Sequence, residues 1–498
     1  MIRKVTLVSR EIDGIAGAGG LKDVVRGLAD ALYDRGYDVS VIIPRYGFLR
    51  KGRTVHNLKV PLGRRSFNVG VSEMNLSGIS IHLLDAPCFS DKNDIYTYTA
   101  EDAPEPFQIG RGHTDVDEMN ALFQAASVLD LMRDETAPDI VHGHDGHTGL
   151  IPLFMMKFGN PGGFFDRTGF LLTIHNAGRA YQQNLGSLSR AEELTGLPVS
   201  ALSECILENQ VNPLMAAGIF GNVNTVSPGY SRELLSGRDG FSGELGPEYK
   251  RRRIKLKGIY NGINPAQWQG GALFPEDGRP ARRRHVCREL TGGKYPEVKV
   301  SGGIPDPELP WIVFHGRLTV QKGIDSLIGL PGDLDGYSGK FNFIIYGQGE
   351  SDIEKSVQLK TESESGWIFL EGYNRELTSQ LIAAASFVAV PSRWEPCGQI
   401  DMIGQSLGAL PIVHSVGGLK KIRHLIDGFR YSEKKGAGLL GFLQRALEWE
   451  WKKQRRVSRM RKNAENIVYE RRVWRKILVR GYLPLYRKSQ KHIRHRVR

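Results

Sequence analysis

The residues best suited to chemistry follow an apolar run in the second half of the chain. Phe387–Val390 is typical of a buried parallel strand. The loop after it carries the carboxylate Glu395 and reaches Gly398, which we expect to open a helix. In open α/β sheets, ligands bind beyond the carboxyl ends of the strands. Glu395 is therefore placed to accept hydrogen bonds from sugar hydroxyls.

A pair of glycines, Gly417 and Gly418, follows the next predicted strand, Leu410–Val413. A glycine turn at the end of a strand can present bare backbone N–H groups to a phosphate. The ends of these two consecutive strands thus offer a carboxylate suited to a sugar and amides suited to a phosphate. Together they indicate a sugar nucleotide as the ligand.

Two cations, Arg317 and Lys322, follow the predicted strand Trp311–Phe314, and Gly323 is expected to open a helix after them. Cations at a helix entrance can neutralise a diphosphate leaving group. An isolated pair of cations is more often simply solvated. Their position at a strand end, like that of Glu395, favours a functional role.

The first half of the chain offers two weaker candidates. The glycine cluster Gly17–Leu21 can bring amides to a diphosphate or a sugar, although a simple tight turn explains it as well. Asn176 follows the predicted strand Phe170–Ile174 and either contacts sugar hydroxyls or stabilises a turn.

A dense polar group, His142, His144, Asp145 and His147, follows Ile140. Histidine and aspartate are zinc ligands. However, side chains spaced by two in a loop need not converge, and no further Cys/His/Asp group is spaced to complete a site. We therefore expect a histidine that contacts a sugar hydroxyl or a phosphate, and no metal.

Strand–helix alternation is expected to position these groups. Apolar residues recur at the helical period between Leu21 and Arg35, and Gly36 follows as a suitable helix end. The pattern predicts an α/β protein with two doubly wound, Rossmann-like domains facing a central cleft. The expected divisions are a first domain at 1–265, a connector at 266–308, a second domain at 309–472, and a C-terminal helix with a basic tail at 473–498.

The 498-residue chain has a globular composition, with 40% hydrophobic and 24% charged residues. No apolar run approaches the roughly 20 residues that span a bilayer, so we expect no membrane association. The four cysteines are scattered, and the apolar N-terminal segment is too short for a secretory signal. We expect a cytoplasmic protein without disulfides or a zinc site.

The net charge of +13 arises near the C-terminus, because residues 451–498 hold 18 Lys or Arg and two Glu, while residues 1–450 sum to −3. Such a run is most often a solvated helix face and tail. The alternative is contact with RNA, a membrane or another anionic partner. No RNA-binding signature accompanies the run, so a nucleic-acid partner is not favoured.

Seven motifs, in order, resemble those of bacterial glycogen synthases and plant starch synthases, which are retaining glucosyltransferases of the GT-B fold. The motifs are Gly19–Val24, His142–Gly149, Thr173–Asn176, Thr225–Tyr230, Asn261–Ile263, Arg317–Gly323 and Pro391–Gly398. The resemblance covers nearly the whole chain, and the last motif matches the family pattern at every defined position.

The resemblance implies a hexosyltransferase that moves glucose from ADP-glucose or UDP-glucose to the non-reducing end of an α-1,4-glucan. The nucleotide sugar and the glucan are the implied partners, no metal or other cofactor is required, and the oligomeric state is left open. It implies front-face attack, in which the departing phosphate oxygen helps to deprotonate the acceptor hydroxyl.

The resemblance also implies roles for single residues. The implied catalytic residues are Glu395, Arg317, Lys322 and His147. The implied donor-binding residues are Gly19, Gly20, Asn176, Tyr373, Cys397, Gly398, Gly417 and Gly418. The cations would hold the diphosphate, Glu395 the glucosyl ring and Tyr373 the base, while His147 would lie beside the donor sugar. The last helix would return to the first domain, anchored by Trp474, Tyr482 and Tyr486.

Several positions depart from the family pattern, and two of them bear directly on the donor site. Gly17 stands where the family has a lysine, and Lys22 either substitutes for it or points away. Asp401 stands where the family usually has glutamine, and a carboxylate near a diphosphate is unfavourable unless it faces away. Two alternatives stay open: a related retaining transferase with a different donor or a small-sugar acceptor, and a glucan-binding protein with weakened catalysis.

Overall fold

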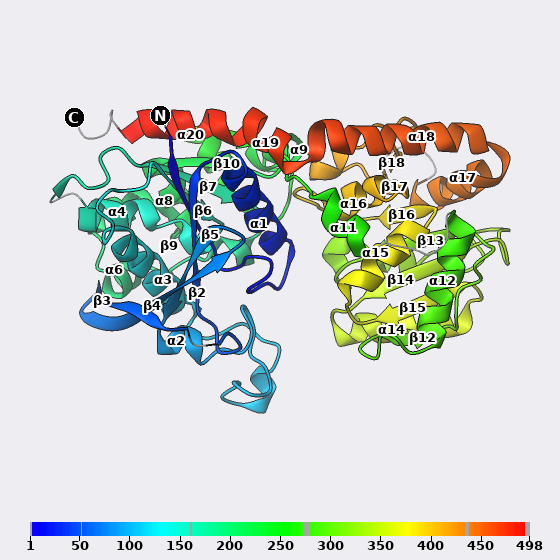
Figure 1. Cartoon of the computed structure of the whole chain (residues 1–498), viewed down its shortest axis with the longest axis horizontal. Helices are drawn as coiled ribbons and strands as arrows, with labels where there is room; N and C mark the ends of the chain where they lie inside the picture. The colour runs from blue at the N-terminus through cyan, green and yellow to red at the C-terminus, as the bar shows by residue number, and fades with distance from the viewer. Residues whose placement is uncertain (1, 51, 160–161, 272–277, 434–437, 494–498) are drawn as a thin grey trace. The chain divides into compact units, whose positions relative to one another are not determined.

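The chain folds into two compact units, Met1–Gly262 with Trp474–Arg498, and Ile263–Val473 (Figure 1). They are seen in a computed structural model that describes residues 2–50, 52–159, 162–271, 278–433 and 438–493. The first unit is therefore discontinuous in sequence. It begins the chain and receives its last helices after the second unit is complete.

A nine-stranded sheet forms the centre of the first unit, in the order β11-β10-β7-β6-β1-β2-β5-β4-β3. The strands from β11 to β5 in this order run parallel, and β3 and β4 add antiparallel pairs at one edge. Their bounds are β1 Lys4–Val8, β2 Asp38–Pro44, β3 Thr54–Leu62, β4 Arg65–Leu76, β5 Ile79–Asp85, β6 Ile140–His144, β7 Gly169–Ile174, β10 Asn222–Thr225 and β11 Leu256–Gly258. A separate hairpin pairs β8 Ile206–Leu207 with β9 Gln210–Val211.

Successive residues of a strand point to opposite faces of the sheet. Val8 and Ile42 lie in one hydrophobic core, and Leu7 and Val41 lie in another. Both faces of the sheet are therefore covered by helices. The helices are α1 Gly20–Tyr33, α2 Pro87–Ser90, α3 Val116–Leu131, α4 Ile151–Gly159, α5 Arg179–Gln182, α6 Leu188–Thr195, α7 Val199–Glu204, α8 Pro213–Phe220, α9 Pro228–Leu235, α10 Leu245–Arg251, α19 Trp474–Ile477 and α20 Leu483–Ile493.

The predicted amphipathic helix is confirmed as α1, which ends at Tyr33 rather than near Arg35. Its apolar stripe is buried, including Leu21, Val25 and Leu28. Gly36 adopts a φ of 78° and donates its amide to the Tyr33 carbonyl, so the chain turns there as the glycine predicted.

The return of the last helices to the first unit is also confirmed. Trp474, Tyr482 and Tyr486 are all buried in the core that contains β1 and α1. Helix α20, red in Figure 1, lies against β6 and β7. The indole of Trp474 occupies the space where Gly27 of α1 would carry a Cβ.

A seven-stranded sheet forms the second unit, in the order β12-β15-β14-β13-β16-β17-β18, and all its pairs are parallel except β12 with β15. The bounds are β12 Lys299–Ser301, β13 Trp311–His315, β14 Asn342–Gly347, β15 Trp367–Glu371, β16 Phe387–Val390, β17 Leu410–His414 and β18 Phe429–Tyr431. Alternate β14 residues enter separate cores, Phe343 in one and Ile344 in the other, so this sheet is also doubly wound.

The helices of the second unit are α11 Pro265–Gly271, α12 Arg279–Thr291, α13 Ile324–Ile328, α14 Ser351–Ser363, α15 Arg375–Ala384, α16 Ile400–Ser406, α17 Gly438–Lys452 and α18 Gln454–Ile467. Helix α12 holds Arg283, which donates to the Ala384 carbonyl at 3.1 Å and to the Ser386 hydroxyl at 2.8 Å. These bonds fasten α12 to the end of α15. Across the described residues, no helix combines the length and the apolar character needed to cross a membrane.

The fit between Gly27 and Trp474 gives a stability prediction. Alanine is usually the better helix residue by about 0.5–1 kcal/mol, but a Cβ at Gly27 overlaps the indole. We expect Gly27→Ala to lower the free energy of unfolding by about 1–3 kcal/mol, measured by urea unfolding. Gly162→Ala is the control, because a Cβ there meets nothing within 4 Å. Equal stability of the two variants would contradict the described packing.

Candidate active site

His142 and His144 lie on strand β6, so the expectation that they belong to a loop is wrong. Residues two apart on a strand face the same side. Their rings accordingly stack, with centroids 4.5 Å apart, and His144 contacts His175 through Nδ1 and Nε2 at 3.0 Å. The group does converge, but as a stack of buried rings.

His142 is a core residue that ties the returning helix to the sheet. The Thr173 hydroxyl donates to Asn224 Oδ1 at 2.9 Å, so it must accept from His142 Nε2 at 2.7 Å. His142 Nδ1 then accepts from the Tyr486 hydroxyl at 2.9 Å. Within the described ranges, no three His, Cys, Asp or Glu side chains are placed to hold a metal ion.

Asp145 belongs to the polar group noted in the sequence, but no specific role was predicted for it, and its backbone is unusual. It adopts φ 60° and ψ −178°, a region that is essentially restricted to glycine and that clusters at functional sites. Its carboxylate accepts from the amides of His175 at 2.6 Å and Asn176 at 3.4 Å. Burial raises the pKa of Asp145 to about 7. Asp145 therefore joins the loops that follow β6 and β7.

His147 lies in the turn after β6 and is 3% exposed. Within the described chain, neither of its ring nitrogens has a hydrogen-bond partner. Burial, and then the charge of Arg10, hold the pKa of His147 well below its usual range. The ring is thus a neutral imidazole that can donate one hydrogen bond and accept another, as the predicted contact with a donor sugar requires.

The side chain of Asn176 stabilises a turn, because its Oδ1 accepts a hydrogen bond from the Gly178 amide at 2.9 Å. This is the turn-stabilising alternative that the sequence left open. Its donor-binding role stays a prediction.

The backbone amides of the glycine loop before α1 bind the carboxylate of Glu11. Glu11 Oε2 accepts from the amides of Ala18 at 2.9 Å and Gly19 at 3.0 Å, and Glu11 Oε1 accepts from the Tyr96 hydroxyl. The Gly19 amide therefore already has an anionic partner, while Gly20 begins α1. Glu11 was missed because no periodicity or motif links it to the loop.

Lys22 resolves one open question. Its side chain lies where a Cβ on Gly17 would be, so it folds across the loop rather than pointing away from it. A glycine at 17 is what leaves room for this path. The loop therefore carries a lysine side chain, although not from the position where the family has one.

In the second unit, Lys322 and Glu395 form an ion pair at 2.6 Å, which joins the loop after β13 to the loop after β16. Glu395 is 8% exposed and also accepts from the Ser392 hydroxyl at 3.1 Å. Burial alone would raise the pKa of Glu395, but the charge and hydrogen bond of Lys322 outweigh it and the pKa is lowered. Two predicted catalytic residues thus meet, with the carboxylate ionised.

The glycine pair after β17 packs directly on the Glu395 loop. The Gly418 amide donates to the Glu395 carbonyl at 2.8 Å, and a Cβ on Gly418 would overlap the backbone of Cys397. Gly398 has φ 78° and Gly417 φ 40°, a region that favours glycine. These glycines are explained by close approach and by conformation, and their contacts with phosphate stay predictions.

Tyr373 follows β15 and is 47% exposed. It stacks at 6.1 Å on His315, whose ring lies 4.9 Å from that of Tyr346. Burial lowers the pKa of His315 to about 4. The predicted base-stacking residue thus has a neutral aromatic neighbour that sequence patterns did not reveal.

Arg317 follows β13 at the same edge and is exposed, and its role stays a prediction.

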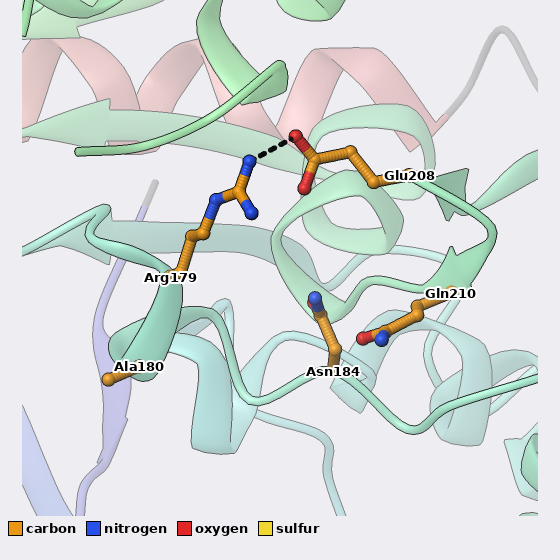
Figure 2. A pocket seen from close by; sticks show the side chains of 5 residues that line it. All are labelled: Arg179, Ala180, Asn184, Glu208 and Gln210. Carbon is orange, nitrogen blue, oxygen red and sulfur yellow. Dashed lines mark hydrogen bonds and ion pairs between the residues drawn. The ribbon is translucent and has the colours of Figure 1, made fainter. Parts of the chain in front are cut away.

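A cavity of about 560 Å³ opens in the first unit beyond Asn176. Figure 2 shows its lining, in which Arg179 pairs with Glu208 at 2.9 Å beside Asn184 and Gln210. The residues predicted from the sequence are not among those lining it. Its amides and charged groups suit hydroxyl-rich ligands.

The comparisons with known proteins agree with these features. Residues 4–246 match the family described as starch synthase catalytic domain, and residues 309–447 match glycosyl transferases group 1. A glycogen synthase from Desulfitobacterium hafniense is 30% identical over 465 residues, which cover 89% of this chain and 91% of that protein. The chain belongs to the glycogen synthase family. A second glycogen synthase, from Aeromonas salmonicida, is 29% identical over 93% of this chain and 94% of its own length.

Solved structures show the fold of this family member. The catalytic domain of starch synthase IV from Arabidopsis thaliana, bound to ADP and acarbose, superposes with a TM-score of 0.79 at 23% identity and covers 99% of this chain and 100% of that one. A sucrose-phosphate synthase from Thermosynechococcus elongatus gives 0.59 at 16% identity, covering 98% of each chain. The predicted GT-B fold is confirmed, and the glycogen synthase homologue is a hexosyltransferase.

The buried histidines predict acid sensitivity of the first unit. Burial lowers the pKa of His142 and His175 to about 3, and those of His144 and His147 well below normal. The unfolded chain binds these four protons below about pH 6.5 and the folded chain does not, so stability falls as pH falls. Asp145, with its raised pKa, has the opposite sign. We expect the free energy of unfolding to drop by about 4 kcal/mol per pH unit below pH 6.

Urea unfolding of the first unit at pH 6.0 and 5.5 measures this slope. His175→Asn removes one of the depressed groups and is expected to reduce the slope by about 1.4 kcal/mol per pH unit. Thr54→Ser, on the exposed start of β3, changes no titratable group and is the control. A slope near zero in the unmodified protein would show that these histidines are protonated in the fold.

Proposed function

We propose that this glycogen synthase homologue transfers glucose from ADP-glucose to the non-reducing end of an α-1,4-glucan, with retention of configuration. The observation that carries the proposal is the Lys322–Glu395 ion pair, made at the strand ends where α/β sheets bind ligands. A solved starch synthase of the same fold was obtained with ADP and acarbose. That pairing of a nucleotide with a sugar ligand supports the choice of donor and acceptor class.

The proposed mechanism uses the cations for charge and the carboxylate for position. Arg317 and Lys322 stabilise the diphosphate as it departs, and Glu395, held ionised by Lys322, accepts hydrogen bonds from glucosyl hydroxyls. The departing phosphate oxygen takes the proton of the acceptor hydroxyl on the same face of the sugar. His147, as a neutral imidazole, bonds the donor sugar, and Tyr373 stacks on the base.

The absence of any cofactor or metal and a cytoplasmic location belong to the same proposal. Glucosyl transfer by this mechanism draws its electrostatic stabilisation from side chains and backbone amides. Excess EDTA is therefore expected to leave the rate unchanged.

The decisive experiment offers radiolabelled ADP-glucose and UDP-glucose separately, each with glycogen, short maltodextrins and free sugars. Incorporation into glycogen from ADP-glucose supports the proposal. Incorporation only into a small sugar, or only from another donor, would establish the related-transferase alternative. Binding to glycogen without transfer, by folded protein, would establish the glucan-binding alternative.

Removal of either member of the ion pair is expected to lower turnover. We expect Lys322→Ala and Glu395→Ala each to reduce kcat about a hundredfold or more, because each removes a contact worth roughly 3 kcal/mol in the transition state. Arg393→Ala is the matched control, because Arg393 lies in the same loop but pairs with Asp325 at the surface. Near-normal turnover of both ion-pair variants would refute the site assignment.

Lys22 provides a separate prediction for the first unit. If its ammonium serves the donor from across Gly17, Lys22→Met lowers kcat/KM for the donor about tenfold and Lys22→Arg restores part of it. Lys59→Met on the exposed face of β3 is the control. Steady-state kinetics at several donor concentrations measure this effect. An unchanged kcat/KM in Lys22→Met would mean that Lys22 only supports the structure of the loop.

A further inference from the structure

Lys421 and Asp401 form an ion pair at 2.7 Å in which neither side chain has any exposed surface. Asp401 lies in the first turn of α16, and Lys421 ends the short turn Gly417–Lys421 after β17. The carboxylate that the sequence placed near a diphosphate is therefore buried against a cation. Its charge is balanced inside the unit.

The ammonium of Lys421 makes two further bonds. It donates to the Cys397 carbonyl at 2.6 Å and to the Gly398 carbonyl at 3.1 Å. Asp401 lies beside the ammonium as a counter-charge, and among the described residues neither of its carboxylate oxygens has a hydrogen-bond partner. Lys421 thus cross-links the loop after β16 to the turn after β17, in addition to the bond from the Gly418 amide to the Glu395 carbonyl.

These two carbonyl bonds fix the direction of two backbone donors. In a planar trans peptide, the N–H group points opposite to the C=O group of the same unit. Because the Cys397 and Gly398 carbonyls point at Lys421, the N–H groups of Gly398 and Gln399 point away from it. Those amides precede α16, whose first turn begins at Ile400.

Stability alone does not explain this arrangement. Desolvation of two charges offsets most of their attraction, and apolar residues of similar size often replace a buried pair without loss. A buried ammonium that holds backbone carbonyls, however, sets the orientation of a loop in a way that an apolar side chain cannot.

We propose that Lys421 is a positioning residue of the donor site. Its ammonium holds the carbonyls of Cys397 and Gly398 so that the amides of Gly398 and Gln399 face the donor diphosphate. Asp401 is the counter-charge that allows the ammonium to be buried, and it does not contact the donor. This inference rests on the proposed function and deepens it, because it names what orients the phosphate-binding backbone.

The test removes both charges at once. In Asp401→Asn/Lys421→Met no unpaired charge is left, so the thermal midpoint is expected to stay within a few degrees of that of the unmodified protein. We expect ADP affinity and kcat/KM for ADP-glucose each to fall at least tenfold, while KM for glycogen is unchanged. If Lys421 is only a structural element, the neutral pair restores ADP binding and kinetics to normal, and that result overturns the proposal.

Two further variants keep the test decisive. Glu450→Gln/Arg461→Met removes another ion pair of the same unit, at 2.8 Å, and is expected to leave ADP binding unchanged. Lys421→Arg keeps the charge but not the compact geometry of an ammonium, and we expect it to lose ADP affinity as well. Should the neutral double variant not fold, normal ADP affinity in Lys421→Arg overturns the proposal.

Calorimetry with ADP and UDP on the unmodified protein separates the two levels of inference. If the unmodified protein binds ADP and transfers glucose, and the Asp401→Asn/Lys421→Met variant binds ADP normally, only the positioning role of Lys421 is refuted. The proposed function then stands. If the unmodified protein binds neither nucleotide, the proposed function fails and the positioning role fails with it.

Discussion

One constraint governs both candidate sites: the carboxyl ends of parallel strands meet at a single edge of a sheet. Lys322 after β13 and Glu395 after β16 are 73 residues apart in sequence and 2.6 Å apart in space, because β13 and β16 are neighbours. The same geometry places Gly418, after β17, on the Glu395 loop. Without a parallel sheet, these loops would not share an edge.

Charge is buried differently in the two units. In the second unit, buried carboxylates pair with cations: Glu395 and Asp401 pair with lysines, and Asp427 pairs with Arg423. The first unit instead keeps a stack of imidazoles neutral by desolvation, and His142 and His144 are fully buried in it. Neutral rings can donate and accept hydrogen bonds without the cost of burying a charge. The edge that follows β6 is therefore polar without carrying a large charge.

Much of the fold follows from local patterns, whereas several site contacts do not. Apolar runs located β13, β16 and β17, and helical periodicity located α1, because burial leaves a periodic signature. His142 and His144 were assigned to a loop because polar residues end an apolar run, yet they continue the strand as buried rings. Glu11 binding the glycine loop and Lys421 pairing with Asp401 depend on tertiary contacts between loops, for which a single sequence carries no periodic signal.

The discontinuity of the first unit has a consequence for how the chain is made. Tyr486 completes the core around His142, 344 residues upstream. Domains generally fold as units during synthesis, so the second unit can close while the first still lacks α20. A ribosome-bound chain would then hold its first sheet with the surface of β6 and β7 uncovered until the last helix emerges, and shielding by a chaperone would matter most at that moment.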